Sequence, residues 1–345
     1  MAKFKIYKIH FTSPLHISDQ REDASNSQKS IHSDTLHAAL IACLTKAGHP
    51  IPEEGDLGCI ISDMFPYYQK DKESDPIYFL PMPLRATLPE LADPADIKKV
   101  KKVRWVDSRL FDALLGGQKF FSAGSNDIGL IQASYMTRFK LPEDSTGSKE
   151  FVCSEVMQRV SIKDRSGHDP AIPYFVDRIS FRDESGLYFL AYGDDTYLLE
   201  EALRILQLEG MGTDRYVGYG FFEAISEDKN GNQLEMEIKT PDDADFQVAL
   251  SLLIPESSEQ LKQLLEPDQA AYDFSRRGGW ITTEPWSSFR KNAVYAFLPG
   301  SVFGKTDGKM SIGKMIDLKP TYEGCSVDHP IWRNGQSIML PIKIN

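Results

Sequence analysis

The sequence predicts an α+β protein built from two units of the split βαβ type. Strand-like and helix-like segments alternate along the chain, but without the sustained spacing of a parallel α/β sheet. The length of 345 residues is sufficient for two such units with buried cores. The segment Pro241-Asp242-Asp243 interrupts the pattern, so we expect one domain at residues 1–240 and a second at 241–345.

The first strand is expected at residues 3–11, which read KFKIYKIHF. Phe4 and Ile6 are out of phase with Tyr7, Ile9 and Phe11. A strand with one solvated face would keep its apolar residues in a single phase, so this strand has either a bulge or two buried faces.

A helix follows, with a cap at Ser33 or Asp34 and an end at Gly48. Its apolar stripe has helical spacing and comprises Leu36, Leu40, Cys43, Leu44 and Ala47. His32 and His37 lie about one turn apart at its start. Two histidines do not make a metal site, so a solvated helix terminus is expected.

The rest of the chain gives the same mixture of strands and helices. Residues 187–192 and 221–226 are strand-like, and a helix with Leu199, Ala202 and Leu206 on one face lies between them. The C-terminal part has strand-like runs at 247–254 and 293–298 and a short helix around Leu264. Hairpin turns are expected at Asn230-Gly231 and Asn334-Gly335.

Composition is that of a soluble globular protein, with 41% apolar and 26% charged residues. The net charge of −11 argues against general affinity for nucleic acid, so any such contact must use a local basic track. No run of about 18 apolar residues is present, and the chain begins with a strand and not with a signal peptide. We expect a cytoplasmic protein without membrane contact.

The cysteines indicate neither a metal site nor a disulfide framework. They lie far apart and form no C-x-x-C pair, and they are expected to be reduced. We predict no metal and no cofactor. Residues 299–306 resemble a nucleotide-binding P-loop, but Pro299 replaces its first glycine and no helix follows Thr306, which argues against ATP hydrolysis.

The segment GMGTDRYVGYG at residues 210–220 is the strongest candidate for a binding site. Its glycines are Gly210, Gly212, Gly218 and Gly220, and Arg215 and Tyr216 lie between them. Glycine allows N–H groups to converge on an anion, and arginine adds a fork of donors suited to phosphate. The order of helix, loop and strand differs from that of a dinucleotide fingerprint. The alternative is a flexible turn that needs glycine for geometry alone.

A second candidate is the segment from Met157 to Phe181, where cations alternate with apolar residues around a turn at Ser166-Gly167. This pattern predicts a hairpin. With Tyr174 and its basic side chains it could grip a nucleic-acid strand, or it could be a plain surface hairpin. The basic residues are Arg159, Lys163, Arg165 and Arg178.

His16, at the end of the first strand, is the best single acid or base candidate, because imidazole titrates near neutral pH. Its role in that case would be cleavage of RNA at a ribose 2′-OH. The alternative is a histidine that anchors a loop. No G-x-S-x-G elbow or comparable catalytic signature is present.

Several motifs in order resemble the repeat-associated RAMP proteins of CRISPR systems. The N-terminal ones are Pro14-Leu15-His16-Ile17-Ser18, Ser33-Asp34-Thr35-Leu36 and the glycine loop. Three C-terminal ones are similar to those of the subunit that holds the 5′ handle of the crRNA in type III-A effector complexes. They are Arg276-Arg277-Gly278-Gly279-Trp280, Gly300-Ser301-Val302-Phe303 and His329-Pro330-Ile331-Trp332-Arg333-Asn334-Gly335.

This resemblance implies two ferredoxin-like (RRM-like) domains with a projecting thumb-like hairpin, and no catalytic role. It implies an RNA-binding subunit that caps the crRNA handle in antiviral defence and contacts the large signalling subunit and the backbone subunit. Carried onto this chain, the RNA-binding residues are Gly210, Gly212, Arg215, Tyr216, Gly218 and Gly220 of the loop, Arg159, Lys163 and Arg165 of the thumb, and Arg276, Arg277, Trp280 and His16. Asp214 departs from this pattern, because it would repel phosphate unless it pairs with Arg215.

Two other functions stay open from sequence. The first is a metal-independent endoribonuclease on the same fold that processes crRNA, with His16 or His37 as acid or base. The second is an RNA-independent scaffold in which the glycine loop is only structural.

Overall fold

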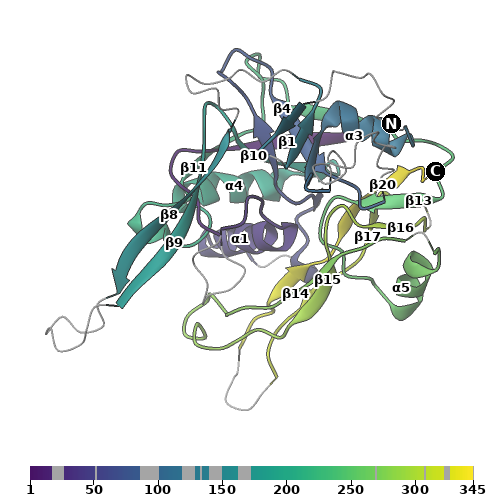
Figure 1. Ribbon diagram of the computed structural model, residues 1–345. Helices are drawn as coiled ribbons and strands as arrows, with labels where there is room; N and C mark the ends of the chain where they lie inside the picture. Colours follow the sequence, from purple (N-terminus) through teal and green to yellow (C-terminus); the bar gives the residue numbers. More distant parts are fainter. Residues whose placement is uncertain are drawn as a thin grey trace, which may run out of the picture.

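The structure, a computed structural model, describes residues 1–17, 27–50, 53–85, 101–118, 129–132, 134–139, 150–161, 172–268, 270–306, 308–321 and 327–344. It has the predicted α+β character, with many strands and few helices (Figure 1). In these ranges no helix is long and apolar enough to cross a membrane.

Ten strands of the described residues form one large sheet: β1 (Ala2–Phe11), β2 (Ile60–Ile61), β3 (Phe65–Tyr68), β4 (Ile77–Pro81), β5 (Trp105–Asp107), β6 (Gly129–Ile131), β7 (Tyr135–Thr137), β10 (Gly186–Tyr192), β11 (Phe222–Ile225) and β12 (Glu235–Ile238). The path through the sheet is β11-β1-β10-β3-β4-β5-β7-β6, and β12 and β2 pair with β1 and β10. Strand β1 therefore has partners on both edges, β10 on one and β11 and β12 on the other.

Strand β1 is buried on both of its faces, which explains its out-of-phase apolar residues. Tyr7 and Ile9 join a core with helices α1 (Ser33–Lys46) and α4 (Tyr197–Glu209). Phe4 and Ile6 join a second core with helix α3 (Ser108–Leu115). Burial on two faces is the second of the two alternatives that the sequence allowed.

The C-terminal part forms a second sheet in the order β16-β13-β20-β17, with strands β13 (Phe246–Ala249), β16 (Val302–Gly304), β17 (Ser311–Ile312) and β20 (Ser337–Ile342). Helix α5 (Ser258–Leu265) is the only α-helix among the described residues of this part. Two ribbons extend it: β14 (Phe274–Arg277) with β15 (Val294–Phe297), and β18 (Met315–Asp317) with β19 (Trp332–Asn334). Val248 and Leu340 pack in the same core as Phe4 and Ile6, so the two parts share buried surface.

The predicted hairpin is present and projects from the body of the protein (Figure 1). Strand β8 (Val152–Ser161) pairs with β9 (Ile172–Phe181) in antiparallel register from Val152↔Phe181 to Ser161↔Ile172. Its turn lies outside the described residues, as do Lys163 and Arg165. At its base, Leu15 bridges to Ile179 and links the hairpin to the segment that follows β1.

Candidate nucleic-acid interface

The glycine loop, residues 210–220, connects helix α4 to strand β11. All four of its glycines have positive φ, and a short 3-10 helix, η2 (Arg215–Val217), lies between them. A Cβ on Gly220 would lie 1.8 Å from the carbonyl oxygen of Met211, and a Cβ on Gly212 would lie 2.5 Å from that of His16. Backbone meets backbone at both positions, so only glycine fits there.

Most N–H groups of these glycines are used inside the protein. Gly210 donates to the carbonyl of Leu206, Gly218 to that of Arg215 and Gly220 to that of Pro14. The N–H of Gly212 has no such partner among the residues that the structure describes, and that glycine is exposed. Three of the four glycines thus use their donors to close the loop, and phosphate binding by the loop stays a prediction.

The hairpin and the glycine loop, predicted separately, meet in the structure. Arg159 Nη1 lies 2.5 Å from Asp214 Oδ2, and the guanidinium lies 5.0 Å from the ring centre of Tyr219. Tyr219 Oη also donates to Met157 Sδ at 3.8 Å. Asp214 thus pairs with an arginine, but with Arg159 of the hairpin and not with Arg215. The pairing neutralises the carboxylate that would otherwise repel phosphate.

The tip of the loop is exposed and carries a cation beside an aromatic ring. Tyr216 is 89% exposed. The Arg215 side chain is 46% exposed, and its guanidinium lies 3.7 Å from Glu209 Oε2, a carboxylate that Lys46 also binds at 2.6 Å. An ion pair of this length at an exposed site holds a side chain weakly, so Arg215 is free to turn to another anion.

The two faces of the hairpin differ. Glu155, Met157 and Arg159 alternate along the face that meets the glycine loop. The opposite face carries Val156, Val160 and Phe175, each more than half exposed. The hairpin therefore places charged groups toward the loop and exposed apolar side chains away from it.

His16 is buried at 3% exposure and lies beneath the glycine loop. Its Nδ1 lies 2.5 Å from the carbonyl oxygen of Asp177 on the hairpin, and its own carbonyl accepts the N–H of Thr213 at 3.0 Å. These contacts hold His16 between the loop and the hairpin, and its contact with RNA stays a prediction. The bonds support the loop-anchoring role, which was the alternative reading of the sequence.

The arginines at 276 and 277 and Trp280 lie in the C-terminal part. Figure 1 shows their strand β14 well apart from β8 and β9. Arg277 is held by Asp34, and the Trp280 ring has the Arg290 guanidinium 4.9 Å from its centre. The structure does not bring these residues to the glycine loop.

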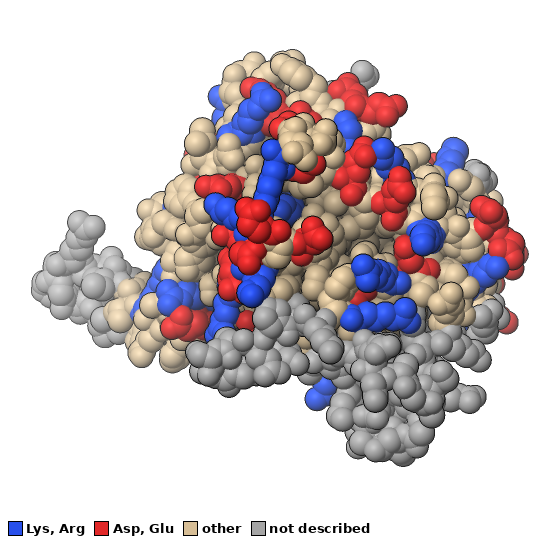
Figure 2. Space-filling view, turned by 90° about the horizontal axis from the view of Figure 1, so that it is seen from above, with Lys and Arg blue, Asp and Glu red and all other residues tan. Residues whose placement is uncertain are grey.

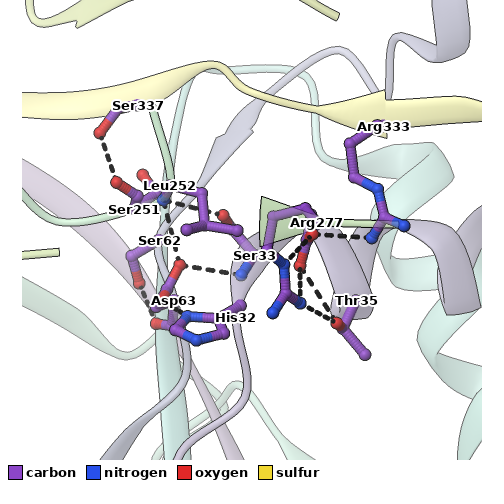
Figure 3. A network of polar contacts seen from close by, with 11 residues as sticks. His32, Ser33, Thr35, Ser62, Asp63, Ser251, Leu252, Arg277, Arg333 and Ser337 are labelled. Carbon is purple, nitrogen blue, oxygen red and sulfur yellow. Dashed lines mark hydrogen bonds and ion pairs between the residues drawn. The ribbon is translucent and has the colours of Figure 1, made fainter. Parts of the chain in front are cut away.

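A buried polar network joins helix α1 to the C-terminal part (Figure 3). Asp34 is fully buried, and its carboxylate binds Arg277 through Nε at 2.8 Å and Nη2 at 3.0 Å, and Arg333 through Nη1 at 2.7 Å. Burial alone would raise the pKa of Asp34, but the two guanidinium groups outweigh it and hold that pKa well below its usual range. Burial and the charge of Arg333 also lower the pKa of Lys291 to about 8.

Helix α1 is capped from elsewhere in the chain, which corrects the prediction of a cap at Ser33 or Asp34. Asp63 Oδ1 accepts the N–H of Ser33 at 2.8 Å, and Oδ2 lies 2.6 Å from His32 Nδ1 (Figure 3). Burial opposes the charged form of His32, yet Asp63 raises its pKa. The helix start is thus buried and not solvated, because the C-terminal part covers it.

His37 is also buried, and its Nε2 bonds to the carbonyl of Gly55 at 2.7 Å. Burial lowers its pKa to about 4. A histidine that is neutral throughout the physiological range and hidden from solvent is poorly suited to donate a proton to RNA.

The lowered pKa of His37 predicts a loss of stability in acid. The unfolded chain takes up a proton near pH 6.5, while the folded chain does so only near pH 4, so stability falls as pH drops between these values. From pH 7 to pH 5 the loss should be roughly 2 kcal/mol. Urea unfolding of the wild type and of His37→Gln measures it.

The variant should lose much less stability over that interval. His32 does not interfere, since its raised pKa means that its contribution is complete below pH 6.5 and is lost only as pH rises. Equal losses in the wild type and His37→Gln would refute this assignment.

Charge on the visible surface is mixed. Figure 2 shows acidic and basic side chains interspersed over one face, without an extended basic field among the coloured residues. Among the described residues, no group of three or more His, Cys, Asp and Glu side chains is arranged to hold a metal ion. On this face a nucleic-acid contact would therefore be local, as the net charge indicated.

Comparison with known proteins gives sequence relatives. Residues 242–342 match the family described as the CRISPR Csm4 C-terminal domain. The CRISPR system Cms protein Csm4 of Thermococcus onnurineus (strain NA1) is 28% identical over 236 residues, which cover 65% of this chain and 64% of that protein. The Csm4 protein of Streptococcus thermophilus is 28% identical over 149 residues, covering 43% and 46%. The chain thus aligns with less than two thirds of either relative.

Solved structures share the fold. A crystal structure of a Csm1–Csm4 cassette in complex with pppApA has a chain with a TM-score of 0.57 and 19% identity, covering 100% of this chain and 99% of that one. A Csm3–Csm4 subcomplex of a type III-A CRISPR-Cas interference complex gives a TM-score of 0.60 and 17% identity, covering 98% and 99%. At these identities the likeness is one of fold. Together with the sequence matches, it relates this chain to the Csm4 proteins of CRISPR systems, and residues 242–342 are similar to their C-terminal domain.

Proposed function

We propose that this chain is a non-catalytic subunit of a type III-A CRISPR effector complex that binds the 5′ handle of the crRNA and joins the large signalling subunit to the backbone. The observation that carries the proposal is the contact between the glycine loop and the hairpin, made by Arg159 and Asp214, with Arg215 and Tyr216 exposed beside it. Relatedness to Csm4 proteins supports the assignment.

The partners follow from the same relatedness. Structures with this fold were solved as a Csm1–Csm4 cassette and as a Csm3–Csm4 subcomplex. We propose a Csm1-type large subunit and a Csm3-type backbone subunit as the neighbours of this chain.

We also propose a ferredoxin-like N-terminal domain, residues 1–240. The order β11-β1-β10-β3, with α1 between β1 and β3 and α4 between β10 and β11, is that of a split βαβ unit. The second domain, 241–345, is supported by a family match that begins at residue 242. With α5 as its only described α-helix, it would be an incomplete version of the same unit.

In this proposal the loop and hairpin form one clamp for single-stranded RNA. Arg215 would pair with a handle phosphate, and the exposed ring of Tyr216 would stack on a base. Arg159 would act by position, because its guanidinium is already bound to Asp214 and fixes the hairpin against the loop. Lys163 and Arg165, which lie outside the described residues, remain predicted contacts of the thumb.

A non-catalytic role is favoured over the endoribonuclease. Both candidate acid or base groups, His16 and His37, are buried, and their ring nitrogens bond to backbone carbonyls. The loop tip argues against the scaffold alternative, because a purely structural loop does not need an exposed arginine beside an exposed tyrosine.

Arg215→Ala tests the proposal. Binding of end-labelled guide RNA that carries its 5′ handle should weaken roughly tenfold, as expected for loss of one charged hydrogen bond. The slope of log K against log salt should fall by about 0.7 because one phosphate contact to a single strand is removed. The measurement is a titration across salt concentrations, repeated with RNA that lacks the handle.

Arg204→Ala is the matched control, because it removes the same charge from an exposed arginine, 70% accessible, on helix α4. It should leave affinity and salt slope unchanged. Equal effects of the two variants would reduce the role of Arg215 to general charge, and no effect of either would favour the scaffold. Cut RNA after incubation with the wild type would point to the nuclease.

A further inference from the structure

The ribbon of β14 and β15 has two faces with different roles. Arg277 and Val294 form one cross-strand pair, and Ser275 and Ala296 form another, on the face turned toward the protein. Ala296 is buried with Leu252 and Ile254, and Arg277 binds Asp34. The inner face is therefore held to the rest of the protein by Ala296 on one strand and by Arg277 on the other.

The outer face carries the alternate residues of the same strands. Phe274 and Arg276 alternate along β14, and Arg276 pairs across the ribbon with Tyr295. Phe274 is 53% exposed and Tyr295 is 63% exposed, and Tyr272 at the start of the ribbon is 44% exposed. We call these four residues, Tyr272, Phe274, Arg276 and Tyr295, the outer face.

Two aromatic rings of the outer face pack on each other, and the third packs on a neighbouring phenylalanine. Phe274 and Tyr295 are edge to face at 5.9 Å, and Tyr272 is edge to face with Phe297 at 5.2 Å. Phe274 and Phe297 are paired across the ribbon, so these rings form an apolar ridge along it. Arg276 is exposed at its side, and its guanidinium has no ion-pair or hydrogen-bond partner among the described residues.

We propose that the outer face is the docking surface for the large subunit, which would offer it an apolar groove with a carboxylate opposite Arg276. This inference rests on the proposed function. Exposed aromatic side chains that gather in one patch mark interaction sites. Tyr, Phe and Arg are also the residues enriched in the cores of protein interfaces.

The chemistry of this face favours protein over RNA. A face that binds single-stranded RNA combines several cations with rings whose flat surfaces are open to bases. Here one unpaired cation accompanies rings that are already in edge-to-face contacts, Phe274 with Tyr295 and Tyr272 with Phe297. The anchored inner face also keeps the ridge in place before binding, which lowers the entropic cost of docking.

The large subunit fits this face better than the backbone subunit does. A guide RNA is one continuous chain, so the subunit that holds its next segment must lie where the RNA leaves the glycine loop and hairpin. Figure 1 shows β14 and β15 away from β8 and β9. This places the backbone subunit at the hairpin and leaves the outer face for the other neighbour.

The experiment measures binding of the purified chain to three probes: the large subunit encoded in the same CRISPR locus, the backbone subunit of that locus, and guide RNA with its 5′ handle. The variants are Tyr295→Ser and Arg276→Glu. The control is Tyr197→Ser on α4, since Tyr197 is 66% exposed and so closely matches Tyr295. Thermal unfolding of each variant checks that the fold is retained, as expected for exposed side chains.

Each outer-face variant should weaken large-subunit binding by roughly tenfold or more, the effect of an interface hot spot. Binding of RNA and of the backbone subunit should not change, and Tyr197→Ser should change nothing. Loss of RNA binding instead would make this an RNA surface and overturn the inference, as would loss of backbone binding or no loss at all. A wild-type chain that binds none of the probes would overturn the proposed function as well.

Discussion

Asp34→Ala is expected to destabilise the protein by about 3–5 kcal/mol, the cost of breaking a buried ion pair by removing one partner. The substitution leaves Arg277 and Arg333 without their carboxylate, and their side chains are only 13% and 8% exposed. The two arginines come from strands of the C-terminal part, so their repulsion would act where that part covers helix α1. Chemical denaturation, followed by circular dichroism, measures the loss.

Two further variants separate this buried charge from ordinary surface electrostatics. Glu201→Ala breaks an exposed pair with Arg204 and should cost less than about 1 kcal/mol. Asp34→Asn keeps the shape and an acceptor oxygen but not the charge, so its cost should lie between the other two. An Asp34→Ala variant no less stable than Glu201→Ala would show that the arginines find other partners or water.

Local patterns in the sequence predicted local structure well. The apolar stripe of Leu36, Leu40 and Leu44 gave helix α1, and the alternation around Ser166-Gly167 gave the hairpin, because helix and strand periods depend on neighbours in the chain. The phase shift in the first strand correctly indicated burial on both faces, because Ile6 and Tyr7 pack in different cores.

These local patterns could not predict contacts between residues that are distant in the chain. The bonds from Arg277 and Arg333 to Asp34 span 243 and 299 residues. Ser33 and Asp34 fit the start of a helix by residue type, but Asp63 supplies the cap and Asp34 serves the arginines. The sequence contained only a weak signal for this network: an acidic residue at the start of an apolar helix, and two arginines in glycine-containing segments.

The hairpin signals show the same limit. The turn at Asn230-Gly231 forms, and Glu227 bridges to Gln233. Its flanking strands, β11 and β12, pair with successive parts of β1. After Asn334-Gly335 the chain passes from β19, which pairs with β18, to β20, which pairs with β13 and β17. Turn chemistry sets the local bend, while burial decides which strands pair.

For the candidate site, the residue types of the loop indicated which side chains are exposed, but they did not indicate which contacts those side chains make. Arg215 and Tyr216 are exposed as a binding loop requires. Asp214 was expected to repel phosphate unless it paired with its neighbour Arg215, but in the structure it pairs with Arg159, 55 residues away. The loop also uses three of its four glycine N–H groups internally, which composition could not reveal.

Gly220→Ala should disrupt the glycine loop and abolish binding of handle-containing RNA in the proposed function. Gly220 has φ +75°, and an added Cβ would lie 1.8 Å from the Met211 carbonyl oxygen, a backbone atom that cannot turn aside. The clash would separate Met211 from Gly220, whose carbonyl accepts the Met211 N–H at 2.9 Å. This clash and the strain of alanine at positive φ should together lower the stability of the protein by roughly 3 kcal/mol or more.

Gly218→Ala isolates the contribution of crowding. Gly218 also has a left-handed backbone, with φ +94°, but a Cβ there meets nothing within 4 Å. Alanine at this position should cost only the conformational strain, about 1–2 kcal/mol, and RNA binding should be largely kept. Comparing the stability and RNA affinity of the two variants therefore separates the need for positive φ from the need for close backbone packing. Equal losses would mean that crowding at Gly220 relaxes, and that the loop's shape does not depend on its contact with Met211.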